Sequence, residues 1–143
     1  MQPLVGAQQL VNMVLIHFHV TSLQQAVWPM IYGIGEWQVP TANSDRHREI
    51  IVAIYNNIKS NRAAKFPYLD SSKLYEMADG STDLEDWIYV DAFTDEDNYK
   101  KMSKALLEDE RATSLRKIWE SLILPSSFRK ELWRDAVPQA WIT

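Results

Sequence analysis

The sequence predicts an α+β fold of the ferredoxin-like type, with a four-stranded antiparallel sheet and helices on one face. A strand-like segment leads directly into a long amphipathic helix, two more strand-like segments flank a polar loop, and a second helical region precedes a last alternating segment. In chain order these segments are residues 31–39, 44–61, 73–78, 87–93, 94–123 and 128–135. The resulting order of strands and helices is that of ferredoxin-like folds.

Composition predicts one compact domain and excludes several functions. With 143 residues, of which 46% are hydrophobic, the chain can bury a core of its own. Its formal net charge of −4 argues against a nucleic-acid binder, which normally carries a basic surface. The absence of cysteine excludes disulfides, thiolate metal sites and a cysteine nucleophile, and it fits the cytoplasmic location that we expect.

Residues 1–29 are expected to form an N-terminal extension to a single domain at residues 30–143. The apolar run at residues 10–20 is too short to span a membrane as a helix, and no Lys or Arg precedes Arg46, as a secretory signal would require. We therefore expect no membrane partner. The extension can be an extra strand or helix that packs on its neighbour, or an arm added to a chain that starts near Met30.

The first strand carries two small residues on one face. In the alternation of a strand, Gly33 and Gly35 share a face with Ile31, Trp37 and Val39. Two glycines on one face leave room for something large, either a helix or a ligand, to approach the backbone.

A long amphipathic helix is predicted from Ser44 to Asn61. Its apolar side chains form one stripe at helical spacing, made of Ile50, Ile51, Ile54, Tyr55 and Ile58. Asn43 or Ser44 is expected to cap its first turn, because either side chain offers an oxygen to a free backbone N–H.

The next two strands are predicted to form a hairpin. Residues 73–78 and 87–93 flank a loop at residues 79–86 that is rich in Gly, Ser, Thr and Asp. The second strand has apolar side chains on both faces, for example Ile88 on one and Tyr89 on the other. Such a strand is expected to be covered on both sides.

A second helical region and a last strand complete the pattern. Thr94 is expected to cap a helix whose first turn, residues 95–97, is acidic. Two apolar stripes separated by a charged stretch predict a bend or break near residues 109–112. Pro125 ends the second stripe, and the alternation of residues 128–135 predicts the fourth strand.

Three stretches of the sequence resemble a known superfamily. They are EWQV at residues 36–39, REIIVAIYNNIKS at 48–60 and SKLYEMADGSTDLEDWIYVDAFTDEDNYKKM at 72–102, and they are similar to the dimeric α+β barrel superfamily. The nearest likeness is to its antibiotic-biosynthesis-monooxygenase-like and NIPSNAP-like domains, over roughly residues 31–135. The resemblance implies a homodimer in which two sheets face each other, with a pocket between each sheet and its helices.

The resemblance bears differently on the activities of this superfamily. Its haem-degrading branch needs an Asn on the first strand and a His on the helix after the third strand, but residues 31–39 contain no Asn and residues 95–123 no His. Asn98 does not replace that His as a haem ligand, and Phe93 stands where those enzymes carry a Trp. Haem breakdown is therefore not expected. The quinone-forming monooxygenases use the substrate's own electron-rich ring to activate oxygen, so no cofactor is expected.

Four aromatic side chains are candidate substrate-binding residues: Trp37, Trp87, Tyr89 and Phe93. Large rigid faces with few polar groups hold flat molecules, so these side chains could line a pocket for a small aromatic ligand. The alternative is that they pack at the dimer interface.

Asp91 and His47 are the candidate catalytic residues. Asp91 lies between Tyr89 and Phe93, and a carboxylate in apolar surroundings has a raised pKa that suits a general base. Its alternative role is to pair with an Arg or to cap a neighbouring backbone. His47 precedes Ile50 by three residues and is the natural proton carrier near neutral pH; otherwise it is a packed, hydrogen-bonded residue at a helix start.

Other catalytic and metal-binding patterns are weak or missing. His17 and His19 would point the same way on a strand, but no nearby Cys, Asp or Glu completes a site, so no metal is expected. No G-x-S-x-G motif supports Ser–His–Asp catalysis. Gly33 and Gly35 fall within a strand and lack the third glycine of a phosphate-binding loop.

Two function classes remain open at this point. The first is a cofactor-independent oxygenase, or a related isomerase or cyclase, that acts on an aromatic or polyketide-like small molecule. The second is a non-catalytic homodimer that binds a ligand or has a structural role. A deep cavity lined by Tyr89, Asp91 and His47 would favour the enzyme. A homodimer is expected in either case, because helices on one face of an apolar sheet leave the other face to be covered.

Overall fold

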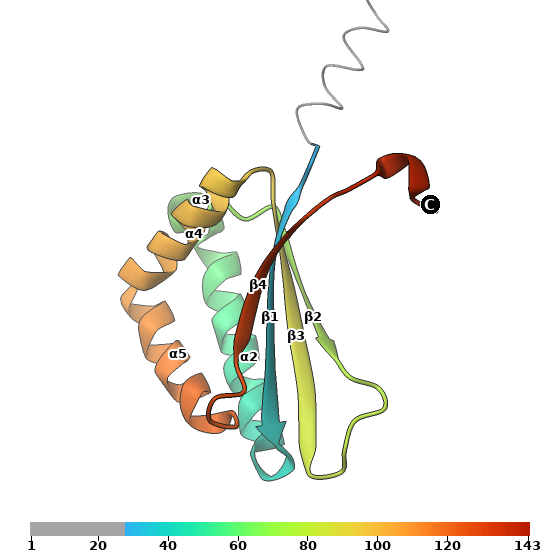
Figure 1. Ribbon diagram of the computed structural model, residues 1–143. Coiled ribbons are helices and arrows are strands. Elements are labelled where there is room, and N and C mark those ends of the chain that lie inside the picture. Colours follow the sequence, from blue (N-terminus) through green and yellow to red (C-terminus); the bar gives the residue numbers. More distant parts are fainter. Residues whose placement is uncertain (1–27) are drawn as a thin grey trace, which may run out of the picture. The chain divides into compact units, whose positions relative to one another are not determined.

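The computed structural model describes residues 28–143, and its elements follow the predicted order (Figure 1). The strands are β1 (Ile31–Pro40), β2 (Ser71–Glu76), β3 (Leu84–Phe93) and β4 (Arg129–Arg134). The helices are α2 (Ser44–Ser60), the short α3 (Arg62–Lys65), α4 (Glu96–Glu108) and α5 (Glu110–Leu122), and a single 3-10 turn, η1 (Thr41–Asn43), precedes α2. All of these lie in one compact unit, residues 30–134.

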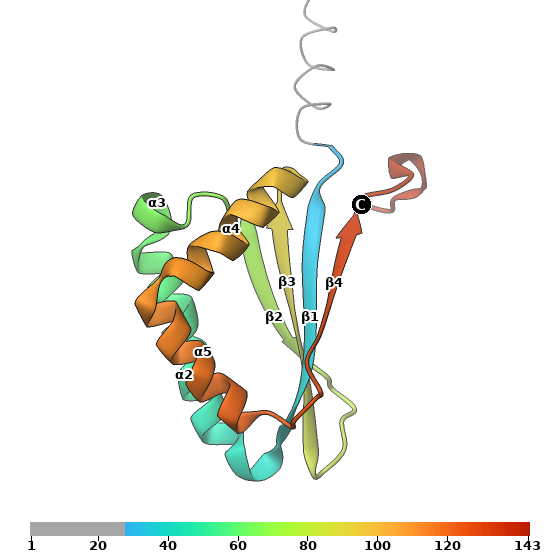
Figure 2. The same cartoon turned by 60° about the vertical axis from the view of Figure 1, so that its left-hand side comes forward.

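The four strands form one antiparallel sheet in the order β2-β3-β1-β4. The central strands β1 and β3 pair along their whole length, from Ile31 opposite Phe93 to Pro40 opposite Leu84. Helices α2, α4 and α5 cover one face of the sheet, and within residues 30–134 no helix covers the other face (Figure 2). This is the ferredoxin-like arrangement, so the predicted fold class is confirmed.

The core between the sheet and the helices has two parts. The first, which we call the Phe93 cluster, contains Ile31, Phe66, Leu69, Phe93 and Met102. The second, the Trp37 cluster, contains Trp37, Val39, Ile51, Trp87 and Ile123. The residues that β1 contributes to these clusters alternate with half-buried residues, as the period of a strand requires.

The hairpin differs from the prediction in its boundaries. β3 begins at Leu84 and not at residue 87, because residues 84–86 pair with the end of β1. β2 begins at Ser71 and ends at Glu76, so the connecting loop is residues 77–83. Pairing with a distant strand extends β3 into a stretch whose local composition is typical of a loop.

The break in the second helical region is confirmed. α4 ends at Glu108 and α5 begins at Glu110, with Asp109 between them in an extended conformation. The Asp109 side chain accepts a hydrogen bond from the backbone N–H of Ala112 and caps α5.

The predicted caps of the other two long helices were wrong. Asp95, and not Thr94, accepts the backbone N–H of Asn98 at 2.8 Å and caps α4. Neither Asn43 nor Ser44 caps α2 with its side chain. Both side chains instead donate to distant parts of the chain: the Asn43 amide to the carbonyl of Leu122, and the Ser44 hydroxyl to Glu85. These hydrogen bonds occupy the side chains that would otherwise cap α2, and their partners come close only in the folded chain.

Two segments lie outside the compact unit. Residues 135–143 contain one 3-10 turn, η2 (Pro138–Ala140), and the indole N–H of Trp141 donates to the carbonyl of Ala136. Residues 1–27, which hold most of the expected extension together with His17 and His19, lie outside the described residues. None of the described helices is long and apolar enough to cross a membrane.

Candidate functional site

A cavity of about 510 Å³ lies between the sheet and the helices. Aromatic and aliphatic side chains make most of its lining, among them Trp37, Ile51, Tyr55, Leu74, Tyr89 and Trp119. The solvent-exposed residues of the lining are Leu107, Glu120, Phe128 and Lys130, so the mouth of the cavity lies beside α5 and β4. A largely apolar cavity with a few polar groups is typical of a small-molecule site.

The two glycines of β1 make room for tyrosine rings at the sheet. Gly35 lies opposite Tyr89, and a Cβ atom at position 35 would clash with that ring. A Cβ atom at Gly33 would come 3.2 Å from the Tyr99 ring. The large groups that approach these glycines are therefore side chains of the protein, and the ring of Tyr89 becomes part of the cavity lining.

Asp91 lies in the cavity lining, at one end of a short hydrogen-bonded chain. The hydroxyl of Ser72, opposite Asp91 on β2, donates to the Asp91 carboxylate. The hydroxyls of Ser72 and Tyr55 share a hydrogen bond of 2.8 Å, and Tyr55 also lines the cavity. Burial raises the pKa of Asp91 to about 6, against the lowering effects of Ser72 and the Lys130 charge. A carboxyl group with this pKa can take a proton near neutral pH.

Two of the four aromatic candidates line the cavity and two do not. Trp37 and Tyr89 are part of the lining, with their ring centroids 6.0 Å apart. Phe93 is buried in the Phe93 cluster, where it packs edge-on against Tyr99. Trp87 is buried behind Trp37, with the two rings nearly parallel at 6.3 Å.

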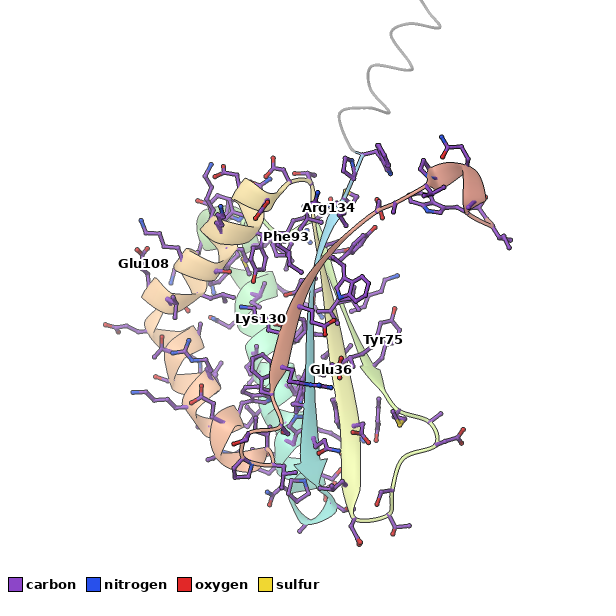
Figure 3. All side chains as sticks on the ribbon, in the orientation of Figure 1. Glu36, Tyr75, Phe93, Glu108, Lys130 and Arg134 are labelled. Carbon is purple, nitrogen blue, oxygen red and sulfur yellow. The ribbon has the colours of Figure 1, made fainter. Side chains whose placement is uncertain are left out.

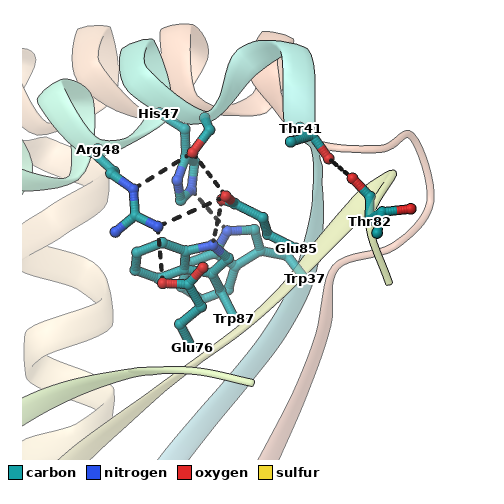
Figure 4. Close-up of polar contacts among 9 residues, drawn as sticks. Trp37, Thr41, His47, Arg48, Glu76, Thr82, Glu85 and Trp87 are labelled. Carbon is teal, nitrogen blue, oxygen red and sulfur yellow. Dashed lines mark hydrogen bonds and ion pairs between the residues drawn. The ribbon is translucent and has the colours of Figure 1, made fainter. Parts of the chain in front are cut away.

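His47 lies outside the lining of the cavity. Its side chain has no exposed surface, and its Nε2 atom accepts the indole N–H of Trp37 at 2.9 Å (Figure 4). Its ring packs edge-on against Trp87 at 4.9 Å. Burial lowers the pKa of His47, which keeps the imidazole neutral and able to accept this bond. The role that the contacts of His47 support is to orient Trp37.

Charged side chains surround the His47–Trp87 pair. Arg48 donates to Glu76 at 2.8 Å, lies 3.7 Å from Glu85 and stacks over the Trp87 ring at 4.9 Å (Figure 4). Glu85 also accepts from the Ser44 hydroxyl and the Trp87 indole. These contacts tie α2 to β2 and β3 at one end of the sheet.

Several lining residues were not identified from the sequence as site residues. The predicted elements placed Ser72 just before a strand, Tyr55 and Trp119 in helices and Lys130 in the last strand. The position of Ser72 could have been found from the hairpin, since the register that pairs Glu76 with Trp87 also pairs Ser72 with Asp91. No feature of the neighbouring sequence marks Lys130 as a site residue. It reaches the cavity because β4 pairs with β1. Among the described residues, no three His, Asp or Glu side chains gather as metal ligands.

Comparison with known proteins identifies the fold of this chain. No family model and no curated protein matches the sequence. Solved structures do match: a NIPSNAP family protein from Agrobacterium tumefaciens is 14% identical, with a TM-score of 0.58 over 75% of this chain and 86% of that one. SnoaB, a cofactor-independent oxygenase from Streptomyces nogalater, is 14% identical, with a TM-score of 0.51 over 76% of this chain and 97% of that one. The chain shares their fold.

A third solved structure of similar fold belongs to a protein that is described as dimeric. A dimeric protein of unknown function with a ferredoxin-like fold, from Bacteroides fragilis, is 12% identical, with a TM-score of 0.52 over 74% of this chain and 96% of that one. The predicted likeness to monooxygenase-like and NIPSNAP-like domains is thus confirmed for the fold. At these identities a shared fold does not carry an activity with it, so the function is argued from the site.

Proposed function

We propose that this protein is a small-molecule enzyme that oxidises an aromatic or polyketide-like substrate with molecular oxygen and without a cofactor. The observation that carries the proposal is the apolar cavity with the Asp91 carboxyl in its lining. The rings of Trp37, Tyr89 and Trp119 offer flat faces to a flat substrate. The shared fold with a cofactor-independent oxygenase supports the proposal by analogy.

Asp91 is the proposed general base. A ring methylene next to a carbonyl is acidic. When Asp91 removes one proton from this methylene, it leaves a carbanion whose charge the aromatic rings of the substrate delocalise. This electron-rich anion can reduce oxygen and combine with it, and the resulting hydroperoxide loses water to give a ketone. The methylene carbon gives up four electrons and oxygen takes four, so the sum is CH₂ plus O₂ to C=O plus H₂O.

The contacts of Asp91 suit this role. The Ser72 hydroxyl stabilises the carboxylate before the reaction, and the Asp91 carboxyl can return its proton to the leaving oxygen. Tyr55 holds the Ser72 hydroxyl from the other side, and burial raises the pKa of Tyr55 to about 12, so it stays a neutral donor. The apolar walls limit the water that could compete for the base.

Anthrone is a suitable test substrate, because it is a flat tricyclic ketone with an acidic methylene. Purified protein in air-saturated buffer at pH 7 is expected to convert anthrone to anthraquinone faster than buffer alone, with one oxygen consumed per anthrone. Asp91→Asn is expected to slow this reaction by about a hundredfold or more, since general-base catalysis contributes on that order. Oxygen uptake and quinone absorbance measure the rate.

Asp86→Asn is the matched control. Asp86 is on the same strand, faces the other side of the sheet and accepts from the Gln38 side chain, so its substitution should leave the rate unchanged. Equal rates for the wild type and Asp91→Asn, or no acceleration by the wild type, would contradict the proposal.

A non-catalytic ligand-binding protein is the second candidate. This function is favoured because His47 lies outside the cavity, so the described residues of the lining include no histidine that could transfer a proton. Anthrone that quenches the fluorescence of Trp37 and Trp119 without oxygen uptake would support this function over the oxygenase.

We also propose that the protein acts as a homodimer through the face of the sheet opposite the helices. The strand register places apolar and aromatic side chains together there: Tyr32, Ile34, Tyr75, Ile88, Val90 and Trp133. Tyr75 on the edge strand β2 and Trp133 on the opposite edge strand β4 are 49% and 56% exposed, and large exposed aromatic groups on one face of a sheet are typical of an interaction surface. Figure 3 shows Tyr75 on this side of the sheet and Lys130 on the helix side. A second copy would cover these side chains.

A further inference from the structure

Lys130 belongs to the cavity, but the proposed oxidation does not use it. It lies on β4 opposite Gly35 of β1, and its side chain is on the helix side of the sheet (Figure 3). Its Nζ atom is 5.6 Å from the centre of the Tyr99 ring, a cation–π contact that keeps the ammonium at the mouth of the cavity.

The charges of the lining leave this ammonium without an acidic partner. Arg116 and Glu120, also part of the lining, pair with each other at 3.6 Å. The Asp91 carboxylate accepts from Ser72. Among residues 28–143, no carboxylate forms an ion pair with Lys130. A ligand at the mouth of the cavity therefore meets an unpaired positive charge.

We propose, resting on the function proposed above, that the substrate is a flat aromatic acid whose carboxylate binds Lys130. Its ring system lies against Tyr89, and its reacting carbon lies at Asp91. Lys130 then sets both the class of substrate and the direction in which it enters.

The layout of the sheet supports this orientation. β4 and β3 are separated by β1, and Lys130 lies opposite Gly35 whereas Asp91 lies opposite Gly33, so their backbones are about 12 Å apart, two strand spacings across and two residues along the sheet. Between them lie Gly33 and Gly35 of β1, and because they have no side chains the Tyr99 ring approaches Gly33 and the Tyr89 ring lies over Gly35. A fused-ring acid can bridge this distance over the face of Tyr89, with its carboxylate at one end and its reacting carbon at the other.

Anion binding at Lys130 would also strengthen the base. The positive charge of Lys130 lowers the pKa of Asp91, although burial is the larger influence and acts in the opposite direction. A carboxylate that neutralises Lys130 removes this lowering effect. Asp91 then holds a proton more firmly once the acid is bound, so substrate binding and base strength are coupled.

The test compares 2-naphthoate with 2-naphthamide, which share a ring system and differ in charge. Isothermal titration calorimetry measures the binding of each to the wild type and to Lys130→Gln. The wild type is expected to bind both ligands, with naphthoate the tighter. Lys130→Gln is expected to weaken naphthoate binding about fivefold, the size of a partly exposed charge pair, and to leave naphthamide binding unchanged. Lys130→Arg should retain naphthoate binding.

Lys100→Gln is the control, because Lys100 is exposed on α4, is not part of the cavity lining and its substitution changes the net charge equally. Equal weakening of both ligands by Lys130→Gln, an equal effect of Lys100→Gln, or no binding of either ligand to the wild type would overturn the proposal. Neither ligand has the reactive methylene of anthrone. Naphthoate binding through Lys130 without anthrone oxidation would therefore overturn the oxygenase alone.

Discussion

Among residues 28–143, the largely buried carboxyl group of Asp91 has only one hydrogen-bond donor, the Ser72 hydroxyl. Burial penalises the charged form, so the folded protein binds a proton at this site more tightly than the unfolded chain does. The same environment that suits Asp91 to the proposed role of a base near neutral pH therefore lowers stability when the group is ionised. Such a conflict between activity and stability is common for side chains that serve a function.

Asp91→Asn is expected to stabilise the protein, and more so at high pH. The pKa of Asp91 is about 6 in the folded protein and 3.8 in the reference state, so its favourable contribution is present below pH 4 and lost as the pH rises through 6. Between pH 5 and pH 8 the advantage of Asp91→Asn should grow by about 1 kcal/mol. Urea unfolding at both pH values measures it, and a difference that is constant with pH would contradict the expectation.

His47 has the opposite dependence on pH. Its pKa in the folded protein is lowered, chiefly by burial, while Glu85 and Glu76 raise it and Arg48 lowers it further. The unfolded chain therefore binds the proton more tightly, and stability falls as the pH drops below the usual value of 6.5.

His47→Phe is expected to destabilise the protein at pH 8 by about 1 to 3 kcal/mol, because it leaves the buried indole N–H of Trp37 without an acceptor. The deficit should shrink between pH 8 and pH 5, since the variant has no imidazole to protonate at this site. Guanidinium unfolding across this range tests the trend. Parallel stability curves for the two proteins would show that His47 titrates equally in the folded and unfolded states.

Asp109 joins three helices at the break between α4 and α5. Its carboxylate accepts from Lys65 at 2.9 Å, from the backbone N–H of Ala112 at 2.9 Å and from Asn57 at 3.0 Å. These bonds, with that from Lys65 the largest influence, hold the pKa of Asp109 at about 2. The break is thus a junction that fixes α5 against α2 and α3.

Asp109→Ala is expected to cost about 2 kcal/mol at neutral pH, more than the loss of a simple cap, because it also removes the hydrogen bonds from Asn57 and Lys65. Asp95→Ala is the matched control: it removes an exposed cap with one bond to the N–H of Asn98 and should cost about 1 kcal/mol. Denaturant unfolding at pH 7 compares the two. The contribution of Asp109 is present above pH 4 and is lost as the pH falls towards 2. Equal costs for the two caps would show that the helix junction adds nothing.

The proposed homodimer depends on the face of the sheet that no described helix covers. Analytical ultracentrifugation at micromolar concentration is expected to show a dimer. Val90→Glu should convert it to a monomer, because it places a charge among the apolar side chains of this face. Val52→Glu makes the same chemical change on the exposed side of α2, where Val52 is 57% exposed, and should leave the dimer intact. A monomeric wild type, or a dimer that survives Val90→Glu, would contradict the proposed interface.

The order of the elements could be predicted because it rests on short-range periodicity. Alternation in β1 and the helical stripe of α2 are visible within one segment each, and the break at Asp109 follows from a charged stretch between two apolar ones. The apolar neighbours of Asp91 in the sequence also predict the raised pKa that the folded protein shows. Each of these properties depends on residues that are close together in the chain.

Contacts between elements could not be predicted in this way. The sequence alone determined the ferredoxin-like order and the candidate base. Only the tertiary structure decided that Asn43 and Ser44 bond to distant partners, that His47 faces Trp37 and not the cavity, and that Lys130 reaches the cavity mouth. The physical reason is that periodicity sets which face a side chain occupies, whereas strand register and helix packing set which other faces it meets.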